Sequence, residues 1–183
     1  MAWPAFLALF GWFALSGCAL ADDRAPDYRD RLTVKAETPD GLRTGTSVIQ
    51  VKQSLGRPGG APANSQIYTR VRGEAAAMDL TGGQSLFALL RSERNIQWAG
   101  TTVSALTYRI VHAEGKPRFD GVLRLTREVE IPRRYPRNLR LGAYPILVAF
   151  GDLNEPTGIM KVDPDDLAAR FGESVRLKRF TLA

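Results

Sequence analysis

Cysteine and histidine are nearly absent: the chain of 183 residues has one of each. A single cysteine, Cys18, excludes an intrachain disulfide. Zinc sites need several histidine or cysteine ligands, so we expect neither zinc nor another cofactor. His112 would have to be the base of any Ser-His-Asp arrangement, with Ser104 and Asp120 near it in the sequence. The chain has no Gly-x-Ser-x-Gly motif, so His112 is better interpreted as a solvent-facing residue at the end of a strand.

Charged side chains are missing from the first 17 residues, which form an apolar run of signal-peptide length. A bilayer span needs about 20 apolar residues, so this run is too short for one. It ends in Leu15-Ser16-Gly17-Cys18, which resembles the bacterial lipoprotein signal. The resemblance implies that residues 1–17 are removed and that Cys18 is lipidated. Residues 18–27 would then be a tether, and residues 28–183 a single β-rich domain.

Two other interpretations of the N-terminus stay open. Ala19-Leu20-Ala21 is an A-x-A motif, and cleavage before Asp22 would give a soluble periplasmic protein without Cys18. The absence of Lys or Arg near Met1 departs from the usual signal pattern, and an uncleaved anchor is the third possibility. Under the lipoprotein interpretation, Ala19 after the cysteine favours the outer membrane, facing the periplasm, over the inner membrane.

The remaining sequence predicts a mainly β domain, a sandwich or open barrel of about eight short strands with one short helix near the C-terminus. The strongest signal is a hairpin in which Arg31–Glu37 alternates between apolar and polar residues, Thr38–Gly41 turns, and Arg43–Lys52 returns. Further strands are expected at Ile67–Leu80 with a bend at Gly73, Ser85–Leu90, Val103–Val111, Val122–Ile131, Ala143–Phe150 and Ser174–Leu182.

The helix is predicted just before the last strand. Asp163 is expected to be its N-cap, Pro164 its first residue and Gly172 its end, with Asp165 and Asp166 in the acidic first turn.

Several segments together resemble a family of uncharacterised exported proteins from proteobacteria. The resemblance covers nearly all of the chain after Tyr28, and it implies no activity, ligand or catalytic residue. Its segments are Tyr28–Val34, Gly45–Val51, Val71–Ala75, Ser85–Leu90, Tyr144–Phe150 and Val162–Gly172.

Positive charge is in excess, with a net charge of +6. Four arginines, Arg133, Arg134, Arg137 and Arg140, lie in a proline-containing stretch that is the best interaction candidate, because guanidinium groups pair with phosphate and carboxylate. Arg176, Lys178 and Arg179 are expected to extend this patch. The alternative is an ordinary solvated loop whose arginines pair with nearby acids.

Acidic residues offer weaker candidates. A calcium site could draw on Asp152, Glu155, Asp163, Asp165 and Asp166, but the spacing lacks the order of a calcium loop. Glu128 and Glu130 share one face of a predicted strand, and we interpret them as exposed residues rather than a catalytic pair.

The sequence therefore favours a non-enzymatic envelope lipoprotein, held at the membrane by its N-terminal lipid, that contacts an envelope protein or an anionic lipid or glycan. The predicted location in the cell envelope argues against nucleic acid as a partner. The alternatives are a soluble periplasmic protein that binds a small ligand through Trp98, Tyr108 and Tyr144, or a hydrolase that uses carboxylates or His112.

Overall fold

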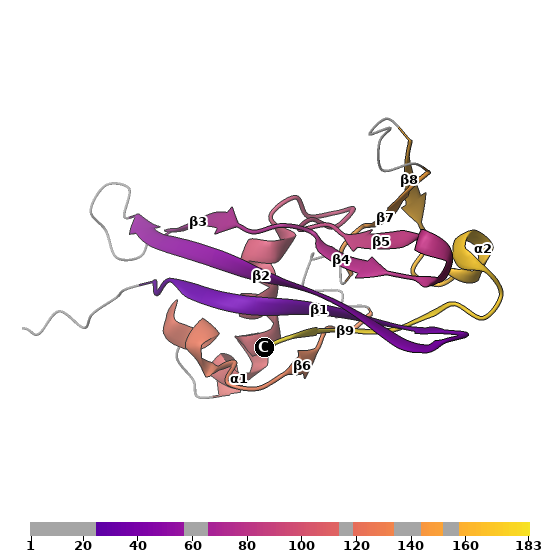
Figure 1. Cartoon of the computed structure of the whole chain (residues 1–183). Coiled ribbons are helices and arrows are strands. Elements are labelled where there is room, and N and C mark those ends of the chain that lie inside the picture. Colours follow the sequence, from indigo (N-terminus) through magenta and orange to yellow (C-terminus); the bar gives the residue numbers. More distant parts are fainter. Residues whose placement is uncertain (1–24, 57–65, 114–118, 134–143, 152–157) are drawn as a thin grey trace, which may run out of the picture.

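The computed structural model describes residues 25–56, 66–113, 119–133, 144–151 and 158–183, with the backbone alone at 108–113 and 119–120. Within these residues, nine antiparallel strands form one open sheet in the order β6-β9-β1-β2-β4-β5-β7-β8, and β3 pairs with β2 (Figure 1). The predicted mainly β, open architecture is confirmed, and the sheet is not a closed barrel. The strands are β1 (Tyr28–Thr38), β2 (Gly41–Gly56), β3 (Gln66–Arg72), β4 (Ala76–Asp79), β5 (Ser85–Ala88), β6 (Val129–Glu130), β7 (Leu147–Phe150), β8 (Ile159–Val162) and β9 (Arg176–Leu182).

The predicted hairpin is the longest pairing of the sheet. β1 and β2 run antiparallel from Tyr28 opposite Val51 to Thr38 opposite Gly41. Gly41 has a φ of 107°, which a residue with a side chain rarely adopts, and it allows the chain to reverse after Pro39 and Asp40.

The strand structure is interrupted at the position of the bend predicted at Gly73, since β3 ends at Arg72 and β4 begins at Ala76. A Cβ at Gly73 would lie 3.2 Å from the carbonyl oxygen of Val48, so the backbones of the two segments approach closely there. β2 therefore pairs with β3 along one stretch and with β4 further along.

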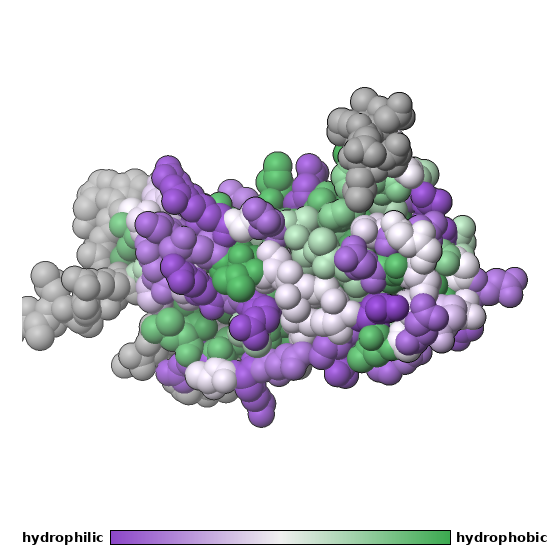
Figure 2. All heavy atoms as spheres, viewed as in Figure 1, coloured by the Kyte–Doolittle hydropathy of each residue, from purple (hydrophilic) through white to green (hydrophobic). Residues whose placement is uncertain are grey.

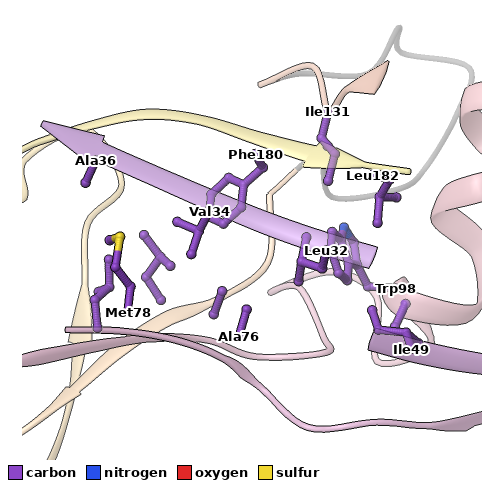
Figure 3. Close-up of a cluster of buried hydrophobic side chains, with 14 of the residues drawn as sticks. Leu32, Val34, Ala36, Ile49, Ala76, Met78, Trp98, Ile131, Phe180 and Leu182 are labelled. Carbon is purple, nitrogen blue, oxygen red and sulfur yellow. The ribbon is translucent and has the colours of Figure 1, made fainter. Parts of the chain in front are cut away.

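The core lies between two parts of the curved sheet. Leu32, Val34 and Ala36 project from β1 towards Ala76 and Met78 of β4 (Figure 3). All five side chains are buried, as are those of the first three residues of β7, whereas the fourth is partly buried. β7 lies between β5 and β8, as the apolar run of that segment predicts.

One predicted strand is a helix. Val103–Val111 was expected to alternate as a strand, but it lies within α1 (Trp98–Ala113). The buried residues Trp98, Ala99, Thr102, Val103 and Thr107 recur at helical spacing. β-Branched residues favour strands only weakly, and here burial of one helical face prevails over that preference.

Local hydrogen bonds make this helix possible. The Asn95 side chain accepts a hydrogen bond of 2.9 Å from the backbone N–H of Gln97, just before the helix begins. Within the helix, the Thr102 hydroxyl donates to the carbonyl oxygen of Trp98 at 2.6 Å, and Thr107 donates to that of Val103 at 3.0 Å. These bonds satisfy two hydroxyl groups that would otherwise be buried without a partner.

The prediction of a strand over Val122–Ile131 is wrong in its first half. Residues Phe119–Arg124 form the 3-10 helix η4, and strand structure is limited to β6. Val122 joins the core, whereas Leu123 is 53% exposed.

The C-terminal helix is shorter than predicted. It is the single turn α2 (Ala168–Phe171), and it ends at Gly172 as expected, where φ is 105°. A separate 3-10 turn, η3 (Thr81–Gly83), lies between β4 and β5. Asp163 is not its N-cap: its carboxylate accepts a hydrogen bond from the N–H of Asp165 in a preceding turn, and Asp166 accepts from Ala169. Among the described helices, none has the length and hydropathy to cross a membrane.

Gly45 of β2 provides a test of this packing. A Cβ there would press on the carbonyl oxygen of Ala77 and lie 2.7 Å from Cβ of Met78. We therefore expect Gly45→Ala to lower the free energy of unfolding by ~1–3 kcal/mol, measured by urea denaturation, because the β2–β4 contact has to open. The exposed neighbour provides the control: Thr44→Ala should change stability by less than ~0.5 kcal/mol. Equal stability of the two variants would contradict the described approach of β4 to β2.

Candidate functional site: a basic sheet face

A group of cations that form no ion pair with the described residues lies on the sheet face opposite α1. Five exposed residues define this surface, which we call the basic face: Arg29, Arg31, Lys52, Arg70 and Arg72. Side chains alternate along a strand, so each of them points away from the core residues of its own strand. On the other face, Gly100 of α1 packs against Thr69 and Val71 of β3, and its carbonyl accepts a hydrogen bond from the Tyr28 hydroxyl.

Strand register brings the five cations together. Arg29 and Arg72 lie on opposite sides of Gln50, in one row across β1, β2 and β3. In the next row Lys52 is paired directly with Arg70. Like charges that face each other across a strand pair are destabilising, so this arrangement lacks a structural justification within the sheet itself.

Several cations elsewhere on the described surface have acidic partners. Lys35 lies 3.4 Å from Glu128, and Arg43 lies 3.5 Å from Asp40. Lys178 pairs with Glu37 and Lys161 with Glu93. No such ion pair involves the basic face within the described ranges, so its five charges remain available to an external anion.

The basic face has apolar and aromatic members as well. Val48 lies opposite Arg31 and Tyr68 opposite Ser54, and both are more than half exposed, at 57% and 55%. Figure 2, in the view of Figure 1, shows hydrophilic residues gathered over the end of the sheet where β1, β2 and β3 lie, and paler, more hydrophobic residues over β4 and β5.

A shallow hollow borders this surface. It has a volume of about 470 Å³ and lies where β2 changes partner from β3 to β4. Its lining is small and mostly polar, which suits water or a polar group better than an apolar ligand. The lining residues are Thr46, Ser47, Val48, Gly73, Glu74, Ala75 and Ala77.

The arginine patch predicted from the sequence is only partly described. Arg133 places its guanidinium carbon 5.7 Å from the centre of the Tyr144 ring and forms an ion pair with Asp165. Arg134, Arg137 and Arg140 lie outside the described residues. Arg133 is thus typical of the alternative prediction, an ordinary surface arginine that pairs with a nearby acid.

The residues predicted to extend that patch lie among acidic side chains. Arg176 and Arg179 lie on β9, opposite Glu37 and Lys35 of β1. Lys178 of the same strand pairs with Glu37. The β9 cations therefore lie beside acidic residues near the hairpin turn, apart from the five residues of the basic face.

The structure separates the predicted hydrolase residues. Ser104 and His112 are eight positions apart in α1, which places their Cα atoms ~12 Å apart, too far for a Ser–His pair. Asp120 lies in η4. The side chains of His112 and Asp120 are outside the described part.

The predicted acidic candidates are exposed where they are described. Glu128 accepts a 2.6 Å hydrogen bond from the Thr181 hydroxyl, and this bond and Lys35 lower the pKa of Glu128, the reverse of what a general acid needs. Glu130 is exposed on β6. Asp163, Asp165 and Asp166 are exposed, Asp152 and Glu155 lie outside the described residues, and no group of three potential metal ligands occurs among those described.

The aromatic residues considered for a ligand cavity have other surroundings. Trp98 is buried in the core at 1% exposure, and the ring of Tyr144 packs edge-on against Phe180 with centroids 4.9 Å apart. The side chain of Tyr108 is outside the described part. Neither Trp98 nor Tyr144 lines the hollow.

Asp30 of β1 is a buried carboxylate that the sequence analysis missed. It is 4% exposed on the core side of β1, and both carboxylate oxygens lack a hydrogen-bond partner in the described structure. Burial raises the pKa of Asp30 to about 7, while its own amide, outside good hydrogen-bond geometry, acts weakly in the opposite direction. Burial, and then the charge of Asp30, also raise the pKa of Tyr28.

The raised pKa of Asp30 predicts a pH-dependent stability. The folded state binds the proton of Asp30 more tightly than the unfolded chain, where the pKa of Asp is ~3.9. The stability that this tighter proton binding provides is therefore complete below about pH 4 and is lost as the pH rises to about 7. Asp30→Asn should match the parent protein at pH 4 and exceed it at pH 8, by at most ~4 kcal/mol in free energy of unfolding. Urea denaturation across this range measures the difference, and a constant difference would contradict the burial of an unpaired carboxylate.

The sequence predicts only part of the basic face. Alternation places Arg31 on the outward side of its strand, but the five cations come from three separate strands, and none of these strands is a run of charged residues. Comparisons with known protein families, with characterised proteins and with solved structures found no match for this chain. The resemblance to exported proteobacterial proteins therefore stays a prediction, and the geometry of the basic face carries the functional argument.

Proposed function

We propose that this protein is a non-enzymatic envelope lipoprotein, tethered to a membrane through lipid on Cys18, whose β domain acts by contact with an anionic surface or an acidic envelope protein. The observation that carries the proposal is the basic face: five exposed cations on one side of the sheet that form no ion pair within the part of the chain that the structure describes.

Electrostatics supports a role in binding. The direct opposition of Lys52 and Arg70 raises the energy of the isolated sheet, and an anion placed between them would relieve that repulsion. Three further positions on this face are arginines, whose planar guanidinium groups can bind phosphate or carboxylate through two parallel hydrogen bonds.

The position of β1 supports the link between tether and face. β1 begins at Tyr28, and Arg29 and Arg31 lie within its first four residues. Ten residue steps separate Cys18 from Tyr28 and span at most ~35 Å when extended. A lipid on Cys18 would thus hold the basic face close to the membrane and raise its effective concentration there.

The non-enzymatic part of the proposal rests on side-chain arrangement. Ser104 and His112 are set apart by α1, and the pKa of Glu128 is lowered rather than raised. Asp30 has a perturbed pKa but is buried, where a substrate cannot reach it.

The tether is tested at Cys18. In a Gram-negative host, we expect the intact mass of the mature protein to show a diacylated or triacylated Cys18 and the protein to fractionate with membranes. Cys18→Ala should move it to the soluble fraction, because the lipid chains supply most of the membrane affinity. An unmodified mature N-terminus at Asp22 would reject the tether and support a freely diffusing periplasmic domain.

The basic face is tested with a soluble polyanion. Arg29→Gln combined with Arg31→Gln should weaken binding of dextran sulfate about tenfold, since an exposed ion pair contributes up to ~1 kcal/mol. Arg43→Gln combined with Arg176→Gln removes the same charge near the hairpin turn and should have little effect. Equal loss in both double variants would show that net charge, not the basic face, governs binding.

A further inference from the structure

We propose that the basic face binds the phospholipid bilayer itself, lying against anionic headgroups with β1, β2 and β3 parallel to the membrane. This inference rests on the proposed function and identifies its partner. The ligand chemistry is phosphate on a lipid headgroup, presented as a plane of charges rather than as a single molecule.

The spacing of the cations favours an extended partner. Arg29 and Arg31 are two positions apart on one strand, as are Arg70 and Arg72 on another, which separates the Cα atoms of each pair by ~7 Å. Neighbouring strands are ~4.8 Å apart, so Arg29 and Arg72, on either side of Gln50, are ~10 Å apart. One small anion can contact two of these residues at most, whereas a plane of headgroups can contact all five.

The uncharged members of the face suit a membrane interface. Tyr68, 55% exposed at one end of the face, has an apolar ring and a hydroxyl, and tyrosine is enriched at the level of lipid headgroups. Its hydroxyl lies 3.2 Å from the side-chain oxygen of Gln66, so the ring is held at the surface rather than folded onto the core. Val48, 57% exposed among the cations, adds apolar area that an aqueous polyanion would not cover.

Charge on the rest of the molecule also favours one orientation. Glu37 and Glu128 lie on the same side of the sheet as Arg29 and Arg31 but nearer the hairpin turn, where they pair with Lys178 and Lys35. Docking through the part of the sheet near the hairpin turn would bring these carboxylates towards the negative headgroups, which is repulsive. Asp27, which accepts a 2.8 Å hydrogen bond from the N–H of Gln53, and Glu74, beside the hollow, are the acids that border the basic face.

The test separates electrostatic docking from the lipid anchor. The Cys18→Ala protein, which cannot be lipidated, is sedimented with vesicles of phosphatidylcholine alone or of phosphatidylcholine with one third phosphatidylglycerol. We expect binding to the anionic vesicles only, and we expect it to weaken as the ionic strength rises, because the attracting charges are exposed.

Variants locate the contact. Arg70→Gln combined with Arg72→Gln should lower the vesicle affinity about 30-fold, since each cation near an anionic membrane contributes about 1 kcal/mol. Arg43→Gln combined with Arg176→Gln is the matched control and should retain the parent affinity. All four residues are exposed, and thermal unfolding of each variant verifies that the fold is kept.

The outcomes are distinguishable. Loss of binding in the β3 variant alone supports the bilayer as partner. Equal binding to neutral and anionic vesicles, or equal loss in both double variants, overturns it. Binding of dextran sulfate through the basic face without vesicle binding overturns the bilayer but leaves the proposed function standing, with a soluble or protein-borne polyanion as partner; failure to bind either probe rejects both.

Discussion

The long pairing of β1 with β2 is the constraint on which the other features depend. Its register places Leu32, Val34 and Ile49 on one side and Arg29 and Arg31 on the other along the same strands. Because side chains alternate strictly, the hydrophobic interactions that bury one side also fix the positions of the cations on the opposite side. A slip of one residue would bury the arginines, and the cost of burying unpaired charge excludes it.

Curvature allows one sheet to supply both a core and a free face. The strands fold over towards each other, so β1 and β4 contribute facing side chains to the same core, and α1 covers the region of β3. Glycines at the close approaches, Gly45 of β2 and Gly100 of α1, permit this packing because a side chain at either position would meet its neighbour. The uncovered face does not contribute to this core, and its composition is therefore free to serve binding.

Alternation and turn chemistry were sufficient to predict the local structure of much of the chain. The hairpin turn at Pro39–Gly41 and the stop at Gly172 follow from the backbone freedom of glycine and the fixed φ of proline, and the break at Gly73 lies where two backbones approach closely. The wrong assignment of Val103–Val111 as a strand has an equally local origin. Its β-branched residues suggest a strand, while helical spacing of the apolar positions becomes decisive only when something packs against them.

The sequence by itself determined the β class, the main turns, the excess of positive charge and the lipobox-like pattern that ends at Cys18, because each depends on neighbouring residues or on composition. Tertiary structure alone decided the basic face and the burial of Asp30. Arg29, Lys52 and Arg70 are far apart along the chain and meet through strand register, and the exposure of a carboxylate depends on what covers it. Neither strand register nor the burial of a side chain is encoded in a single segment, since both arise from contacts between segments.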